Sequence, residues 1–393
     1  MWEGARSERG PGPSRGTVIR MGNLTGRRVF LDASGSAPMT PRTREAFVAA
    51  MDEGWADPER LHSESRKARA LLDGARASVA GVLGATVEHT YFVPTFGLAF
   101  DRLVGGIAAA RRGRGTVVAS AIERRPLLRI ASRVAETVTL VEVDDAGVID
   151  LEALGRALLS EAVGLALVQH ANQEIGTIQP LEEAYAATLA AHVPLVVDAT
   201  ASIGHIEPPR HWDALAADPA DWGGPQGVAV IAFRPTTRWM PVSPMVLGKV
   251  SVPAALAAAV ALEEREANRT EVAARLARQL ERIRAALSAL PGMRVFGHTE
   301  GSLPHVLTFA CDGTDGEALA AELDRRGFAV GSGSACTTEP SPESHVLAAL
   351  GGGRNGNVRI GLHPGATDDD IDRFLAAATT LIAEARRSPA APR

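Results

Sequence analysis

Between residues 90 and 233, short apolar runs alternate with longer stretches of helical periodicity. The run at 195–198 is apolar until its last residue, as expected of a strand that helices cover on both faces. Such alternation predicts an α/β fold with a mostly parallel, doubly wound sheet, whose ligands bind beyond the carboxyl ends of the strands. The expected strands are 91–93, 116–120, 138–143, 165–169, 195–198 and 228–233, and the expected helices are 68–83, 127–135, 151–159 and 181–191.

The pattern changes after residue 233. A long amphipathic helix is expected over 253–290, because apolar residues recur on one face and a Pro-Gly pair ends it. A smaller α/β unit follows. Its last helix is expected to start at Thr367, a good N-cap with Asp370 three residues on. The other elements expected in this unit are strands at 306–311 and 329–330 and a helix at 314–326.

Three units are expected on these grounds. Residues 1–28 begin with a stretch rich in Gly, Pro, Ser and Arg that lacks the apolar region of a secretory signal. We expect this segment to be a disordered arm or the product of a start codon placed too early. Residues 29–252 are expected to form a large domain, and residues 253–393 the linking helix and a small C-terminal domain with a cysteine loop.

Composition and charge exclude several classes of function. The chain of 393 residues is 46% hydrophobic and 22% charged, which is ordinary for a soluble globular protein. A net charge of −5 gives no reason to expect a nucleic acid or an anionic membrane as a partner. Because Cys311 and Cys336 are the two cysteines, the chain is no disulfide scaffold, and a cytoplasmic location fits best.

Four short motifs carry candidate functional side chains. Cys336 lies in the small-residue stretch GSGSACTT, where a flexible loop could present a nucleophilic thiol. Asp198 ends an apolar strand, where a carboxylate could keep a cofactor's pyridinium nitrogen protonated. Asn172 follows the preceding strand, and Arg359 interrupts an apolar one, as a bidentate carboxylate clamp would. Taken singly, these motifs have ordinary alternatives, such as a plain loop, a structural aspartate or a surface arginine.

In order and approximate spacing, the segments HANQEIG, VVDATASIG, GPQG, GSGSAC and VRIGL resemble those of the cysteine desulfurases, which are class-V aminotransferases. The resemblance implies fold type I, pyridoxal 5′-phosphate (PLP) as cofactor, L-cysteine as substrate, a homodimer, and sulfur transfer toward iron–sulfur cluster assembly. By position, Cys336 matches the nucleophile that holds the persulfide, and Asp198 matches the pyridinium partner. Asn172 matches a residue near the phenolic oxygen of the cofactor and the substrate, and Arg359 matches the clamp on the substrate carboxylate.

The position of the family's Schiff-base lysine departs from this pattern. Counting back from the GPQG turn aligns it with Asp221, and the chain has two lysines, Lys67 and Lys249, neither of them in this region. Without the lysine, PLP has no covalent anchor, and the α-proton of the substrate has no general base. We therefore expect PLP, the cofactor that the resemblance implies, not to be held covalently at this position.

Other cofactor-binding positions also differ. The phosphate-binding turn aligns with Thr95 and Gly97, which flank the bulky Phe96. The histidine that stacks on the pyridine ring aligns with Arg124, and the threonine lent by the other subunit aligns with Ser251. The half of the site that handles sulfur is therefore retained, whereas the half that handles the cofactor is not.

Three hypotheses follow. The first is a catalytically degenerate desulfurase homologue that transfers sulfur through Cys336 or acts as the partner of a true desulfurase. The second is an active enzyme, which uses PLP with Lys249 as an unconventional lysine or binds another anionic ligand near Arg124 and Arg125. The third is a purely structural dimer partner. Cys311, at the end of a strand, is expected to be a core residue under all three.

Overall fold

The computed structural model describes residues 27–240, 249–298, 300–332, 344–352 and 357–387. Most of the expected N-terminal arm and the candidate nucleophile Cys336 lie outside these ranges. Of the helices within these ranges, none combines the length and the apolarity that crossing a membrane requires.

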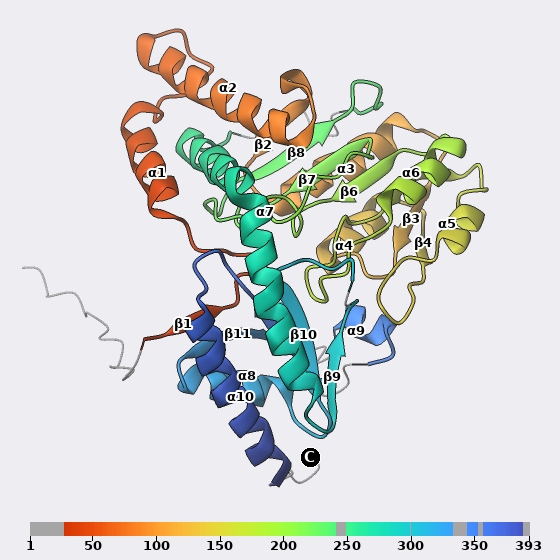
Figure 1. Ribbon diagram of the computed structural model, residues 1–393. Helices are drawn as coiled ribbons and strands as arrows, with labels where there is room; N and C mark the ends of the chain where they lie inside the picture. The colour runs from red at the N-terminus through yellow and green to blue at the C-terminus, as the bar shows by residue number, and fades with distance from the viewer. Residues whose placement is uncertain (1–26, 241–248, 299, 333–343, 353–356, 388–393) are drawn as a thin grey trace, which may run out of the picture.

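A seven-stranded sheet forms the core of the larger unit (Figure 1). Its strands are β2 (Thr90–Val93), β3 (Thr116–Ser120), β4 (Thr137–Val141), β5 (Val163–Leu167), β6 (Leu195–Asp198), β7 (Ala214–Ala217) and β8 (Ala229–Phe233). In the order β2-β8-β7-β6-β5-β3-β4, the neighbours from β7 to β4 are parallel, whereas β8 is antiparallel to β7 and to β2. This confirms the predicted α/β class with a mostly parallel central sheet.

Helices cover both faces of this sheet. They are α2 (Ser63–Leu83), α3 (Phe96–Ala110), α4 (Arg125–Val134), α5 (Leu151–Ala157), α6 (Leu181–Ala190) and α7 (Val252–Ser288). Successive residues of one strand face opposite layers: Val196 of β6 packs with residues of α3 and α4, and Val197 packs with residues of α2, α5, α6 and α7. Burial on both faces explains why the central strands are apolar throughout.

A five-stranded sheet forms the smaller unit, in the order β1-β11-β12-β10-β9. Its strands are β1 (Val29–Leu31), β9 (Met293–Phe296), β10 (Val306–Cys311), β11 (Phe328–Ser332) and β12 (Val358–Gly361), and α8 (Gly316–Arg325) and α10 (Asp368–Arg387) pack on it. β1 pairs in parallel with β11. Residues 29–31 therefore belong to the smaller sheet by hydrogen bonding, although the expected boundary assigned them to the large domain.

The long helix α7 connects the two units. In Figure 1 it passes α1 (Pro41–Glu53) and α2 with its first half and β9, β10 and α10 with its second half. Its residues Leu276, Leu280 and Ile283 lie in the core beneath the smaller sheet, as their helical spacing indicates. The expected cap of α10 is also present, because the hydroxyl of Thr367 accepts the backbone N–H of Asp370 at 3.2 Å.

Candidate functional site

A cavity of about 440 Å³ lies where the carboxyl ends of several central strands meet the smaller sheet. Residues that follow β2, β3 and β5 border it on one side, and residues of β12 and the turn after β1 border it on the other. Such a crevice is the usual ligand site of a doubly wound sheet. Its walls include Asp32, Phe96, Arg124, Asn172, Ser344 and Arg359.

An ion pair occupies the part of the site where the resemblance places the pyridine ring. The Arg124 Nε lies 2.7 Å from Oδ2 of Asp198, which ends β6 and is 2% exposed in its side chain. The guanidinium also lies over the ring of Phe96, 5.1 Å from its centroid. The carboxylate of Asp198 is thus neutralised by an arginine of its own chain.

A second buried acid, Glu123, lies next to this ion pair in sequence. Its Oε1 accepts the backbone N–H of Gln169 at 2.7 Å. Burial, reinforced by the negative charge of Asp198, raises the pKa of Glu123 to about 8. Glu123 is therefore mostly protonated at neutral pH.

Asn172 borders the cavity, but its side chain is engaged locally. Its carbonyl oxygen accepts the backbone N–H groups of Glu174 and Ile175 at 2.8 and 3.1 Å. Its amide donates to the carbonyl oxygen of Ile122 at 3.2 Å. Asn172 therefore shapes the loop after β5, and one edge of its side chain faces the cavity.

Arg359 extends from β12 toward the same cavity. Its Nη2 lies 3.2 Å from Oδ1 of Asp32, and its Nε has no hydrogen-bond partner among the described residues. The neighbouring strand makes room for it with Gly331, where an added Cβ would lie 2.7 Å from Asp32 Oδ1 and 3.1 Å from Arg359 Nη2. The Nε is buried beside Gly331, so the part of Arg359 that borders the cavity is a guanidinium already paired with Asp32 through Nη2.

The other aligned cofactor positions do not converge on the cavity. The hydroxyl of Thr95 caps α3 by accepting the N–H of Leu98 at 3.2 Å, and Gly97 lies in the first turn of that helix. Ser251 caps α7 by accepting the N–H of Ala254 at 3.3 Å. It borders a different cavity of about 760 Å³. Within one chain, Ser251 is therefore not part of the site.

Neither lysine borders the cavity near Arg124. Lys67 pairs with Glu53 at 2.8 Å on the surface, and Lys249 pairs with Asp57 at 2.7 Å beside the 760 Å³ cavity. Cys336 lies outside the described residues, so its distance from Arg359 is not defined. Cys311 is buried, as expected of a core residue.

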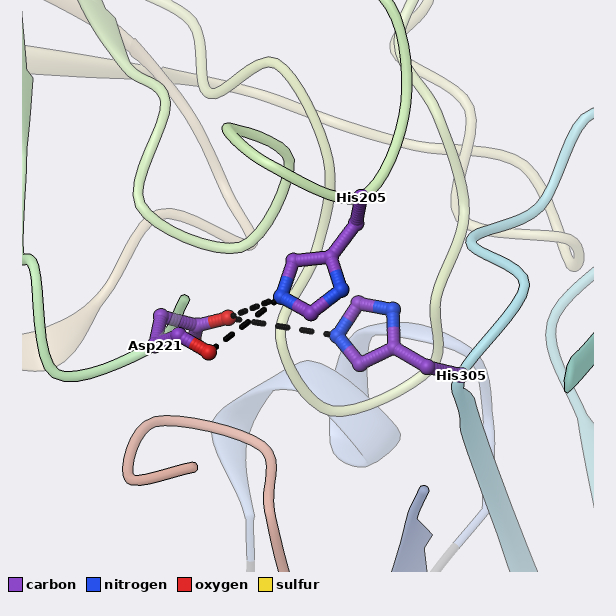
Figure 2. A group of neighbouring side chains, drawn as sticks. All are labelled: His205, Asp221 and His305. Carbon is purple, nitrogen blue, oxygen red and sulfur yellow. Dashed lines mark hydrogen bonds and ion pairs between the residues drawn. The ribbon is translucent and has the colours of Figure 1, made fainter. Parts of the chain in front are cut away.

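Sequence reasoning missed one cluster, which consists of His205, Asp221 and His305 (Figure 2). His205 follows β6, Asp221 lies between β7 and β8, and His305 directly precedes β10. All three are buried, and Asp221 Oδ2 accepts the backbone N–H of Gly35, a residue of the cavity wall, at 2.9 Å. Burial lowers the pKa of His205 to about 3 and that of His305 well below its usual value.

The sequence match to known proteins covers nearly all of the described chain. A model of the class-V aminotransferases matches residues 29–252 and 243–374. The chain belongs to the class-V aminotransferase family. It therefore shares the fold type and ancestry that its motifs predict, and the family is one of PLP-dependent enzymes.

Within this family, the chain is similar to cysteine desulfurases. It is 30% identical over 364 residues to the cysteine desulfurase IscS 1 of Archaeoglobus fulgidus, which covers 88% of this chain and 94% of the relative. It is 25% identical to the cysteine desulfurase IscS of Methanosarcina thermophila, over 93% of this chain and 95% of the relative. A solved structure of a NifS-like protein superposes with a TM-score of 0.83 at 25% identity, over 91% of this chain and 100% of the other.

Proposed function

We propose that this protein is a cysteine-desulfurase-like family member with a degenerate PLP site, which acts in sulfur transfer through Cys336 or as the partner of an active desulfurase. The observation that carries the proposal is the 2.7 Å ion pair between Arg124 and Asp198. In a PLP enzyme of this type, the carboxylate at the position of Asp198 pairs with the pyridinium nitrogen of the cofactor and keeps that nitrogen protonated. Here a guanidinium of the chain itself supplies the positive charge beside that carboxylate, although Oδ2 of Asp198 accepts no hydrogen bond from the described residues.

The remaining residues around Arg124 support the same conclusion. The ring of Phe96 lies against the guanidinium, where the aligned turn would have to bring backbone N–H groups to a phosphate. Neither Lys67 nor Lys249 borders the cavity, so no lysine of the same chain is placed to form a Schiff base there. The described residues therefore do not fit a covalently held PLP, and we derive no reaction step through it.

The opposite wall supports a retained role in sulfur chemistry. Arg359 borders the cavity, and β11, which pairs with β12 at Gly331 and Arg359, leads directly into the segment that contains Cys336. In the proposed step, the Cys336 thiolate attacks the outer sulfur of a persulfide on a donor protein. A new persulfide forms on Cys336 and the thiolate of the donor leaves, so no oxidant or reductant is needed.

The direct test is transfer of labelled sulfur from a persulfide-loaded cysteine desulfurase to this protein. We expect the label on Cys336 of the wild type, loss of the label in Cys336→Ala, and its retention in Cys311→Ala, the control that removes the buried thiol. Equal labelling of Cys336→Ala and the wild type would contradict the relay.

A second candidate function is that of an active PLP-dependent cysteine desulfurase that works as a homodimer. This candidate is favoured by the retention of Asp198, Asn172 and Arg359. It is also favoured by the position of Lys249, two residues before Ser251. Ser251 aligns with the threonine that one subunit of the family's dimers contributes to the site of the other. Repeated turnover of L-cysteine to alanine with added PLP, abolished by Lys249→Ala, would replace the first proposal. Absence of alanine would remove this candidate.

A further inference from the structure

We propose that His205, Asp221 and His305 form a binding site for a divalent transition-metal ion such as Zn²⁺. The inference does not rest on the proposed function, because it needs only these three side chains. One potential ligand atom from each lies within 4.8 Å of the other two. Two imidazoles and one carboxylate are a common ligand set for Zn²⁺ and for other first-row divalent metals.

The separations suit a common metal. The Nε2 of His205 lies 3.0 Å from Asp221 Oδ1, and the Nε2 of His305 lies 3.9 Å from the same oxygen. Ligands at about 2.1 Å from a tetrahedral Zn²⁺ are about 3.4 Å apart, between these two values. Figure 2 shows both nitrogens directed toward the carboxylate of Asp221.

The unsatisfied state of His305 is the independent observation that points to a ligand. The residue is 0% exposed, and neither of its ring nitrogens has a hydrogen-bond partner among the described residues. Leaving a buried polar group without a partner is unfavourable, so native structures contain few such groups. A bound ion would use one of these nitrogens, and the buried carboxyl group of Asp221, whose pKa burial raises, would gain a cation that favours its ionised form.

The arrangement of the rings predicts a movement on binding. The rings of His205 and His305 are stacked, with centroids 3.6 Å apart and planes 9° apart. Because the lone pair of an imidazole nitrogen lies in the plane of its ring, the planes must open toward a shared ion. Binding of one ion by both rings therefore requires at least one ring to rotate, while the backbone N–H of Gly35 holds the carboxylate of Asp221.

The positive charge of Arg265 lies near the proposed site and disfavours a bound cation. A variant without this charge should therefore bind the metal ion more tightly. This buried residue of α7 donates from Nε to the carbonyl oxygen of Trp222 at 2.9 Å, and its charge acts on Asp221 and on both histidines. Removing that charge should make the cluster more favourable for a metal ion. We therefore expect Arg265→Gln to tighten metal binding, whereas loss of any ligand weakens it.

The experiment is titration of the chelator-treated full chain with Zn²⁺ by calorimetry, and with Co²⁺ by visible absorption. We expect one ion per chain, bound at least about 100-fold more weakly by Asp221→Asn and by His305→Gln, since even residues that only orient metal ligands contribute 10–100-fold. The matched control is His170→Gln, which removes a buried histidine that contacts Ser202 at 2.8 Å, and it should bind as the wild type does.

The titrations of the wild type, the two ligand variants and the control decide whether the metal site exists. Stoichiometric binding that is lost in both ligand variants and kept in the control supports the site. The proposal is overturned if the folded wild type binds no stoichiometric ion. It is also overturned if Asp221→Asn and His305→Gln both bind the ion with the affinity of the wild type. If His305→Gln does not fold, the near-isosteric Asp221→Asn and the X-ray absorption spectrum of the wild-type complex decide, because the spectrum shows whether imidazoles coordinate the metal.

Discussion

Two arginine–aspartate pairs contribute side chains to the cavity wall, and they differ in how deeply their acids are buried. Arg124 and Asp198 are 2.7 Å apart, with 13% and 2% of their side chains exposed. Arg359 and Asp32 are 3.2 Å apart, with 12% and 36% exposed, and the Nε of Arg359 has no hydrogen-bond partner among the described residues. The acid of the first pair is therefore buried away from water, whereas the acid of the second is partly exposed to it.

The largest effect on the free energy of unfolding is expected when the pair of Arg124 and Asp198 is broken. This effect shows whether the pair stabilises the fold. In Asp198→Ala, the buried guanidinium of Arg124 loses its anionic partner, so we expect the free energy of unfolding to fall by about 3–5 kcal/mol. Urea unfolding without any added cofactor measures this change. In an enzyme that reserves this aspartate for PLP, the loss would instead appear mainly when the cofactor is present.

The double variant Arg124→Met with Asp198→Ala is the control for this prediction. Because it removes both charges, it should recover most of the stability that the single variant loses. Additive losses in the two single variants and the double variant would show that the two side chains are not energetically coupled.

A smaller effect is expected on the other side, at Gly331. A Cβ there would lie 2.7 Å from Asp32 Oδ1, so Gly331→Ala should cost about 1–3 kcal/mol of unfolding free energy through displacement of the second pair. Gly97→Ala is the matched control, because no atom lies within 4 Å of its added Cβ. Equal stabilities of the two variants would show that the close approach at Gly331 is not required.

Glu123 should make the free energy of unfolding depend on pH. Its pKa is raised from 4.5 to about 8 by burial and then by Asp198, so its contribution to stability is fully present below about pH 4.5. That contribution is lost as the pH rises toward 8, by up to about 1.4 kcal/mol per pH unit. Relative to Glu123→Gln, the wild type should therefore become progressively less stable over this range in urea unfolding at several pH values. Parallel stability curves would contradict the assignment.

The smallest effect is expected for Asp32→Ala. The carboxylate is partly exposed, so water replaces it at Arg359, and the loss of unfolding free energy should be no more than about 1 kcal/mol. A loss as large as that of Asp198→Ala would remove the contrast between the two sides of the cavity.

Much of the fold follows from the sequence because apolar periodicity is a local signal. The long helix α7, the strands β3 and β6 and the cap at Thr367 lie close to where their patterns predict them. β7 escaped prediction because its residues, ALAA, have no β-branched side chain and suit a helix equally well. The pairing of β1 with β11 joins segments almost 300 residues apart, which no local pattern encodes.

The candidate site was predictable only in part. Motif order pointed to Asp198, Asn172 and Arg359, and Asn172 and Arg359 border the cavity. The ion pair of Asp198 with Arg124 joins the segment after β3 to the end of β6. Such a tertiary contact could not be predicted from the alignment of motifs. The three members of the histidine–aspartate cluster lie on separate loops, at spacings that match no short metal-binding motif.

Whether the site can hold PLP covalently is shown by an absorption spectrum of the purified protein with added PLP, before and after borohydride reduction. An active cysteine desulfurase treated in the same way is the positive control. Because Arg124 occupies the carboxylate of Asp198 and no lysine borders the cavity, we predict no aldimine band and no reduced adduct. An aldimine band together with an adduct that maps to Lys249 would contradict the claim that the cofactor side is closed.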